Sequence, residues 1–118
     1  MATGVTFAAV RQLALALPGV EEGTSYGTPA FKVRGKLMAR LREDGETLVL
    51  RVGFDMRDLL MNADPETFFV TDHYLGYPYV LVRLPRIART RLRDVLEDAW
   101  KHSAPKTLLA AHPPRQPR

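Results

Sequence analysis

The chain has 118 residues, of which 17 are lysine or arginine and 13 are aspartate or glutamate, and its formal net charge is +4. This length suits one compact domain with its own core, and the absence of cysteine excludes disulfides, thiolate metal sites and cysteine nucleophiles. Since no apolar run is long enough to span a bilayer and the first residues lack the pattern of a secretory signal, we expect a cytoplasmic protein without membrane contact.

The first predicted element is a helix over about residues 5–17. It follows Thr6, which suits the N-cap position, and its apolar stripe consists of Phe7, Val10, Leu13, Ala14 and Leu17. Pro18 and Gly19 end the helix, because the residue before a proline avoids the α-helical region. The segment 21–29 is rich in turn formers and predicts only a short strand near 24–26.

Two β-hairpins are predicted between residues 31 and 52, because apolar and polar residues alternate there. Reading this segment with period two gives an apolar face that consists of Phe31, Val33, Leu37, Ala39, Leu41, Leu48, Leu50 and Val52. The opposite face receives Lys32, Met38, Arg40, Arg42, Val49 and Arg51. One face should therefore pack on the core, and every charge in the middle of the strands on the other face is positive.

The hairpin registers follow from the same alternation. Keeping Val33 and Leu37 on one face requires a three-residue loop, Arg34-Gly35-Lys36, between the first two strands. Pairing Leu41 with Leu48 leaves a four-residue turn in the second hairpin. Both registers are consistent with the apolar face described above.

The second half of the chain alternates helices and strands. A helix capped by Asp55 is expected to turn four apolar residues inward, namely Met56, Leu59, Leu60 and Ala63. A strand, a loop, a strand, a long helix and a short helix follow over 68–70, 71–78, 79–84, 88–102 and 107–111. Helices at both ends of an antiparallel β-meander predict an α+β two-layer sandwich, with the N- and C-terminal helices packed on one face. We expect one domain, residues 1–111, and a disordered Pro/Arg-rich tail, residues 112–118.

The basic face is the clearest functional signal, because it suits an anionic partner such as DNA. The side chains expected to bind nucleic acid are Lys32, Arg34, Lys36, Arg40, Arg42 and Arg51. The turn 43–46 carries three acids that would repel phosphates, so only the first hairpin turn could join this contact. Two other interpretations stay open: a solvated sheet face whose long cations lie over apolar neighbours, and a homodimer that buries Met38, Val49 and Leu81.

Two loops rich in polar aromatic residues form an alternative site for a small ligand or a protein partner. Its expected residues are Ser25, Tyr26, His73 and Tyr77. Catalysis is not expected, because Asp72 and His73 are sequence neighbours and would point apart, although with Ser25 they supply the residue types of a nucleophilic triad. We expect no cofactor and no metal, since the histidines lack metal-ligand spacing and no glycine-rich phosphate loop occurs.

Several segments resemble the MmcQ/YjbR family of small bacterial proteins in their order and spacing. The matching strings are Leu17-Pro-Gly-Val-Glu-Glu, Ser25-Tyr-Gly-Thr-Pro-Ala-Phe-Lys-Val, Gly35-Lys-Leu-Met-Ala-Arg-Leu, His73-Tyr-Leu-Gly-Tyr-Pro and Trp100-Lys in the closing helix. The resemblance implies a frataxin-like α+β fold and DNA binding through a "double wing" of β-hairpins. Frataxins bind iron through an acidic first helix, but the first helix here has no acid and carries Arg11, so an iron-donor role is not expected.

Overall fold

The computed structural model describes residues 4–112. Its elements in chain order are α1 (Phe7–Leu15), β1 (Val20–Ser25), β2 (Thr28–Val33), β3 (Lys36–Leu41), β4 (Thr47–Arg51), α2 (Phe54–Ala63), β5 (Phe68–Phe69), the 3₁₀ turn η1 (Asp72–Tyr74), β6 (Tyr79–Arg83), the 3₁₀ turn η2 (Leu84–Arg86), α3 (Arg89–Ser103) and α4 (Lys106–Ala111). No helix within residues 4–112 has the length and apolar character needed to cross a membrane. The tail for which disorder is predicted lies, apart from its first residue, outside the described residues.

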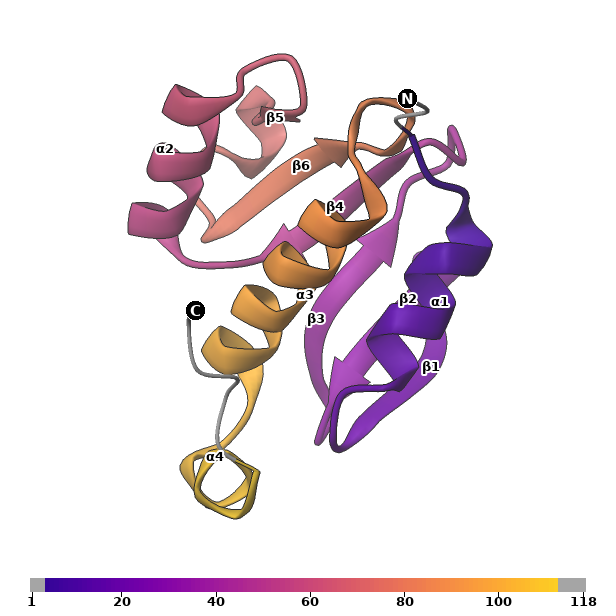
Figure 1. Ribbon diagram of the computed structural model, residues 1–118, viewed down its shortest axis with the longest axis vertical. Coiled ribbons are helices and arrows are strands. Elements are labelled where there is room, and N and C mark those ends of the chain that lie inside the picture. The colour runs from indigo at the N-terminus through magenta and orange to yellow at the C-terminus, as the bar shows by residue number, and fades with distance from the viewer. Residues whose placement is uncertain (1–3, 113–118) are drawn as a thin grey trace.

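The six strands form one antiparallel sheet in the order β1-β2-β3-β4-β6-β5, and α1 and α3 lie across one of its faces (Figure 1). The predicted α+β two-layer sandwich is confirmed. Between the two layers lies a continuous apolar core, to which the sheet contributes Phe31, Val33, Leu48, Leu50, Val80 and Val82, and helix α3 contributes Leu92, Val95, Leu96 and Ala99. The sheet therefore has one face packed on helices and one open face.

The N- and C-terminal helices are tied together by polar contacts at the edge of this core. The buried Trp100 on α3 donates its Nε1–H to the carbonyl oxygen of Pro18 at 2.8 Å, just after α1. Toward the other end of α3, Arg89 Nη2 donates to Gln12 Oε1 at 2.8 Å. The indole N–H thus has the hydrogen-bond partner that burial requires, and the two helices form one layer.

Strand β1 is longer than the sequence predicts, because it covers residues 20–25 instead of a short segment near 24–26. It is an edge strand whose middle residues are exposed, so it has almost no apolar pattern by which it could be recognised. Glu22, which pairs with the core residue Phe31, accepts two hydrogen bonds from Arg11 of α1 at 2.8 and 3.0 Å. These hydrogen bonds lower the pKa of Glu22 and hold the edge strand against the helical layer.

The turn between β2 and β3 has two residues, Arg34 and Gly35, and both have positive φ angles, 50° and 84°. The prediction of a three-residue loop is therefore wrong. Two consecutive residues with positive φ are typical of a type I′ turn, whose twist matches that of the flanking strands. The turn between β1 and β2 has the same form, with Tyr26 at 54° and Gly27 at 79°.

A β-bulge in β3 places Leu37 and Met38 on the faces opposite to those predicted. Lys32 pairs with Leu37 but Phe31 pairs with Ala39, so Met38 is the extra residue between the two pairs. Met38 is consequently fully buried in the core, whereas Leu37 lies on the open face. The prediction had these two residues exchanged, because strict alternation cannot accommodate a bulge.

The β3–β4 hairpin has the predicted register, with Leu41 opposite Leu48 and a four-residue turn between them. Asp44 stabilises this turn: its carboxylate accepts hydrogen bonds from the backbone N–H groups of Glu46 and Thr47 and from the Thr47 hydroxyl, at 2.7 to 2.9 Å. An aspartate that bonds its own turn in this way is a common turn former.

Helix α2 begins at Phe54, with Gly53 in place of Asp55 at the N-cap position. Leu59, predicted to face inward, is 64% exposed, while the inward side of the helix carries Leu60 and the buried Arg57. The sequence did not indicate an inward arginine, because the acceptors of its Nη1 group are carbonyl groups of a distant loop, described below.

Candidate ligand-binding site

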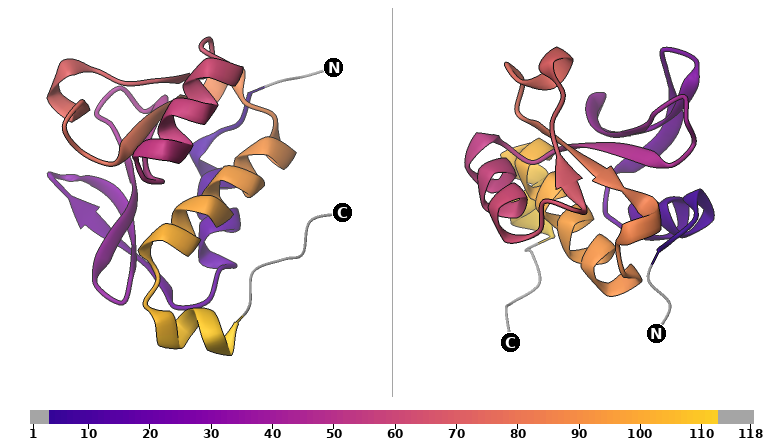
Figure 2. Two further views of the ribbon diagram at one scale, coloured as in Figure 1. Left: turned by 90° about the vertical axis from the view of Figure 1, so that its left-hand side faces the viewer. Right: turned by 90° about the horizontal axis from the view of Figure 1, so that it is seen from above.

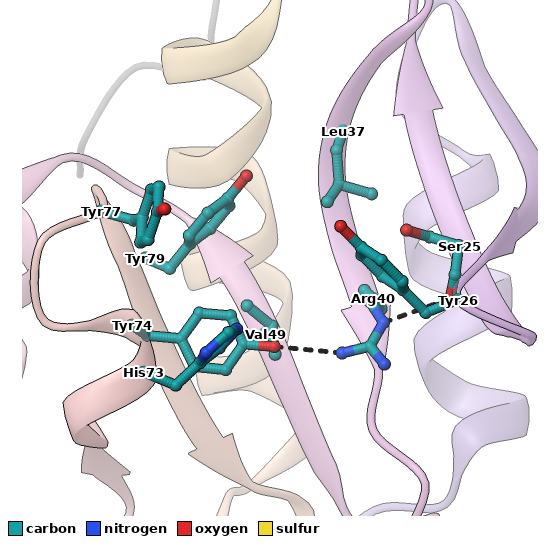
Figure 3. A pocket seen from close by; sticks show the side chains of 9 residues that line it. All are labelled: Ser25, Tyr26, Leu37, Arg40, Val49, His73, Tyr74, Tyr77 and Tyr79. Atoms are coloured by element: carbon teal, nitrogen blue, oxygen red, sulfur yellow. Dashed lines mark hydrogen bonds between the residues drawn. The ribbon is translucent and has the colours of Figure 1, made fainter.

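The open face of the sheet carries a pocket of about 350 Å³ between the β1–β2 turn and the loop 71–78. Seen from above (Figure 2, right), the loop with η1 and the β1–β2 hairpin both rise on the side of the sheet away from α1 and α3. The lining residues are Ser25, Tyr26, Leu37, Arg40, Val49, His73, Tyr74, Tyr77 and Tyr79 (Figure 3). All four tyrosines of the chain are among them.

Tyr26 forms one wall of the pocket in an unusual backbone conformation. It occupies the first position of the β1–β2 turn with a φ of 54°, where asparagine, aspartate and glycine are preferred. Its side chain is 88% exposed, and its ring lies 5.3 Å from the Arg40 guanidinium carbon. The pocket mouth therefore carries a large aromatic residue whose backbone conformation is unfavourable for a residue of this kind.

The loop 71–78 and the start of β6 form the opposite wall. The His73 and Tyr74 rings meet edge to face at 4.8 Å, and the Tyr74 and Tyr79 rings do so at 6.0 Å. Arg57, on the far side of the loop, donates from Nη1 to the carbonyl oxygens of Leu75 and Tyr77, at 3.0 and 2.9 Å. The buried arginine of α2 thus fixes the loop that carries this aromatic wall.

Arg40 lies at the bottom of the pocket and is only 6% exposed. Its Nε donates to the Ser25 carbonyl oxygen at 3.2 Å, its Nη1 to the Tyr74 hydroxyl at 3.1 Å and its Nη2 to Glu43 Oε2 at 2.8 Å. The guanidinium therefore joins the two walls, as the dashed lines in Figure 3 show for the Ser25 and Tyr74 contacts. Both the position and the charge of Arg40 are fixed by its partners.

A second hollow of about 370 Å³ adjoins the first, and Arg40 and Tyr74 line both. It shares part of the lining with the pocket and adds Arg42, Glu43 and Thr71. The acid of the site, Glu43, therefore belongs to this outer hollow and is not among the residues that line the pocket.

The family model described as YjbR matches residues 15–102. The chain belongs to the YjbR family. Uncharacterised proteins of Mycobacterium tuberculosis and Mycobacterium bovis are 37% identical over 68 residues, which is 57% of this chain and 53% of theirs, so the chain matches about half the length of these curated relatives. The crystal structure of the Deinococcus radiodurans protein DR2400, with a DUF419 domain, matches with a TM-score of 0.71 and 21% identity, over 90% of this chain and 86% of that one. This likeness shows the shared fold.

In this YjbR-family structure, the four residues of the alternative ligand site lie together, since Ser25, Tyr26, His73 and Tyr77 all line the pocket. Arg40 and Tyr79, which also line the pocket, were not predicted from the sequence as part of this site. The strand alternation was the available signal, because Arg40 and Tyr79 lie on the same face as Val49, on the two strands that pair with β4.

The residues expected to bind nucleic acid are divided between two places. Arg40 is buried in the pocket, and Arg51 is half-buried and donates to the Tyr79 hydroxyl at 3.4 Å. Lys32 lies directly opposite an acid, Glu21, on the neighbouring strand. Arg42 is half-buried and lines the outer hollow.

The exposed cations Arg34 and Lys36 flank the β2–β3 turn, at another end of the sheet. His102, at the end of α3, lies close to this turn. Burial lowers the pKa of its imidazole below the ordinary value of 6.5, and the nearby positive charges of Arg51 and Lys36 lower it further. This end of the YjbR-family fold therefore holds a cluster of like charges.

Proposed function

We propose that this YjbR-family protein is a non-catalytic binding protein that takes a small molecule in the open-face pocket. The observation that carries the proposal is the convergence of all four tyrosines, from two separate parts of the chain, around one buried arginine. Ligand sites typically combine aromatic and apolar walls with a few fixed polar groups, in volumes of roughly 300–1,000 Å³. The pocket, at about 350 Å³, lies at the lower end of this range and suits a small ligand.

The backbone conformation of Tyr26 supports the same proposal. A left-handed conformation destabilises a bulky residue, and such strain is concentrated at binding and catalytic sites. Arg34 occupies the same position in the β2–β3 turn, with nearly the same φ, but it does not line the pocket. The chain therefore offers a matched pair of turn residues with which binding and stability can be separated.

The experiment replaces each of these residues by asparagine, which tolerates the left-handed conformation. A fragment library is screened against the full chain by ¹H–¹⁵N NMR, and the dissociation constants of the hits are measured for the wild type, Tyr26→Asn and Arg34→Asn. We expect hits to shift the amides of residues 25–27 and 72–79. Tyr26→Asn should weaken their binding about tenfold, the order of loss found when an aromatic anchor is removed, and Arg34→Asn should leave it unchanged.

Stability serves as the control for this pair. Arg34→Asn should raise the free energy of unfolding by roughly 0.5–1 kcal/mol, since it relieves strain without removing a contact. Tyr26→Asn removes one cation–π contact but relieves the same backbone strain. It should therefore lower the free energy of unfolding by no more than about 0.5–1 kcal/mol. Hits that map to another surface, or equal effects of the two variants on binding, would contradict the proposal.

A contact with DNA is a second candidate function, favoured by the cluster of like charges at the β2–β3 turn. Arg34 and Lys36 are exposed there, and the pKa of the nearby His102 is lowered first by burial and then by the positive charges of Arg51 and Lys36. The test is the affinity of a duplex for the wild type and for the double variant Arg34→Ala, Lys36→Ala at increasing salt. A DNA contact predicts a steep salt dependence that the variant reduces; an affinity that is independent of salt and of both residues excludes it.

A further inference from the structure

The chemical groups that line the pocket select one class of ligand, and this inference rests on the proposed function. None of the nine described lining residues is acidic, and Arg40 is the permanent cation among them. A cationic ligand would therefore meet no counter-charge in the pocket. The lining instead offers hydrogen-bond donors, and these donors have a specific origin.

Two tyrosine hydroxyls each accept a hydrogen bond from a neighbouring arginine, which leaves their own hydrogens to be donated. The Tyr74 hydroxyl accepts a hydrogen bond from Arg40 Nη1 at 3.1 Å, and the Tyr79 hydroxyl accepts one from Arg51 Nη1 at 3.4 Å. A guanidinium has no acceptor, so neither phenol can return its own O–H hydrogen to the arginine. Within residues 4–112 neither hydroxyl donates to another protein group, so both hydrogens are available to a ligand.

Arg40 itself retains donor capacity. Its hydrogen bonds to Ser25, Tyr74 and Glu43 use one hydrogen each of Nε, Nη1 and Nη2, and a guanidinium has five. Glu43 approaches from the outer hollow and offsets part of the charge, so the pocket suits a single negative charge better than the double charge of a phosphate. The complement of these donors is a carboxylate.

The remainder of the lining is apolar and flat. Leu37 and Val49 form its floor, and the rings of Tyr26 and Tyr79 stand at opposite sides of it (Figure 3). Flat aromatic walls favour stacking or edge contacts with another ring. We propose that the pocket binds a planar aromatic carboxylate, whose oxygens accept hydrogen bonds from Tyr74 and Arg40 while its ring lies over the apolar floor.

The test compares four small ligands of the same size class by isothermal titration of the full chain. They are 2-naphthoate, its neutral amide 2-naphthamide, the cation 2-naphthylmethylammonium and the non-planar decahydro-2-naphthoate. We expect 2-naphthoate to bind at least about tenfold more tightly than the amide and the ammonium ion, which is the order of discrimination that hydrogen bonds to a charged group provide. It should also bind several-fold more tightly than the non-planar carboxylate, which cannot stack on the aromatic walls.

Two variants connect this preference to the Tyr74 hydroxyl. Tyr74→Phe keeps the ring but removes the donated hydrogen, so it should weaken 2-naphthoate about tenfold and change 2-naphthamide less than about twofold. Tyr79→Phe is the matched control, because the Tyr79 hydroxyl points away from Tyr74 and Arg40 (Figure 3), and it should change the binding of either ligand less than about twofold. A variant that merely disturbs the fold would weaken both ligands alike. Thermal unfolding of each variant shows whether the protein is folded at the temperature of the titration.

The possible failures are distinguishable. If 2-naphthamide, the ammonium ion or the non-planar carboxylate binds as tightly as 2-naphthoate, or if Tyr74→Phe affects carboxylate and amide equally, the ligand class is wrong and the small-molecule pocket stands. The class is also wrong if none of the four ligands binds while fragments of another kind occupy the pocket. If no fragment of any kind binds there, the proposed function fails, and the present inference fails with it.

Discussion

Gly53 joins β4 to α2 in a conformation, φ 90° and ψ 160°, that is essentially restricted to glycine. A Cβ at this position would also lie 3.0 Å from His102 Nε2. Gly53→Ala should therefore lower the free energy of unfolding by about 1–3 kcal/mol, mostly through backbone strain, because the His102 side chain can move. Urea denaturation measures this change.

Gly23, in the edge strand β1, is the matched control for this substitution. It has no positive φ, and a Cβ there would meet no atom within 4 Å. Gly23→Ala should change the free energy of unfolding by less than about 0.5 kcal/mol, as is usual at exposed positions. Equal losses in the two variants would show that the conformation at Gly53 carries no special strain.

His102 makes the stability of the fold depend on pH. Burial, Arg51 and Lys36 lower the pKa of its imidazole in the folded state, so the folded state resists a proton that the unfolded chain accepts. The stability associated with the neutral imidazole should be fully present above about pH 6.5, the unfolded value, and decrease as the pH falls toward the lower folded value.

His102→Gln tests this dependence, because glutamine is neutral throughout the range. The melting temperature of the variant should fall less than that of the wild type between about pH 8 and pH 5. At the upper end of the range both side chains are neutral, so the difference between the two proteins there serves as the reference. Parallel curves over the whole range would exclude His102 as the source.

At the residue scale, the sequence predicted which segments carry the pocket but not how its charge is used. The alternation of the strands placed Arg40 correctly on the face away from the core, beside Val49. Nothing in that alternation showed that Ser25, Tyr74 and Glu43 would surround its guanidinium, because Ser25 and Tyr74 come from other segments of the chain and Glu43 lies in the turn that follows the strand. An arginine that appeared to be an exposed phosphate contact is buried.

At the scale of the elements, helix α2 contributes to the pocket mainly through one side chain, Arg57, which holds the loop 71–78. Arg57 donates two hydrogen bonds to carbonyl groups of the loop 71–78, which carries three of the lining residues. Arg57→Met keeps most of the buried stem but leaves both carbonyl groups without this donor. Hydrogen exchange of the Tyr77 and Tyr79 amides should accelerate, and the free energy of unfolding should fall by about 1–3 kcal/mol.

Asp58→Asn is the control for Arg57→Met. Asp58 is an exposed neighbour whose carboxylate lies 3.7 Å from Arg57 Nε, and an exposed ion pair of this kind contributes about 0–1 kcal/mol. Its removal should leave exchange of the loop amides near the wild-type rate. If Arg57→Met also leaves these rates unchanged, the loop is held by its own contacts and not by α2.

The strands show why some elements are predictable from sequence and others are not. The β3–β4 hairpin was predicted in register because a buried face and an Asp-Gly turn both specify it. The bulge at Met38 was missed because leucine and methionine are adjacent there, and either residue can satisfy the apolar face. Strand β1 was predicted too short, near 24–26 only, because an exposed edge strand has no apolar alternation to read.

For the molecule as a whole, the architecture could be predicted from the periodic spacing of apolar residues in the sequence. The family could be predicted from the order of the matching sequence segments. The helical stripes and the meander require two layers, and the YjbR model matches most of the chain. The homodimer remains a prediction, but Met38, Val49 and Leu81 are already buried within the single chain. A homodimer would therefore have to bury a different surface from the one that suggested it.

The separation of aromatic residues between the two layers has a practical consequence for spectroscopy. The single tryptophan, Trp100, lies in the helical layer, whereas all four tyrosines lie on the opposite side of the sheet. Tryptophan emission, excited at long wavelength, should accordingly follow only the integrity of the fold. Tyrosine absorbance should report the occupancy of the pocket, so the unlabelled protein carries separate optical signals for folding and for binding.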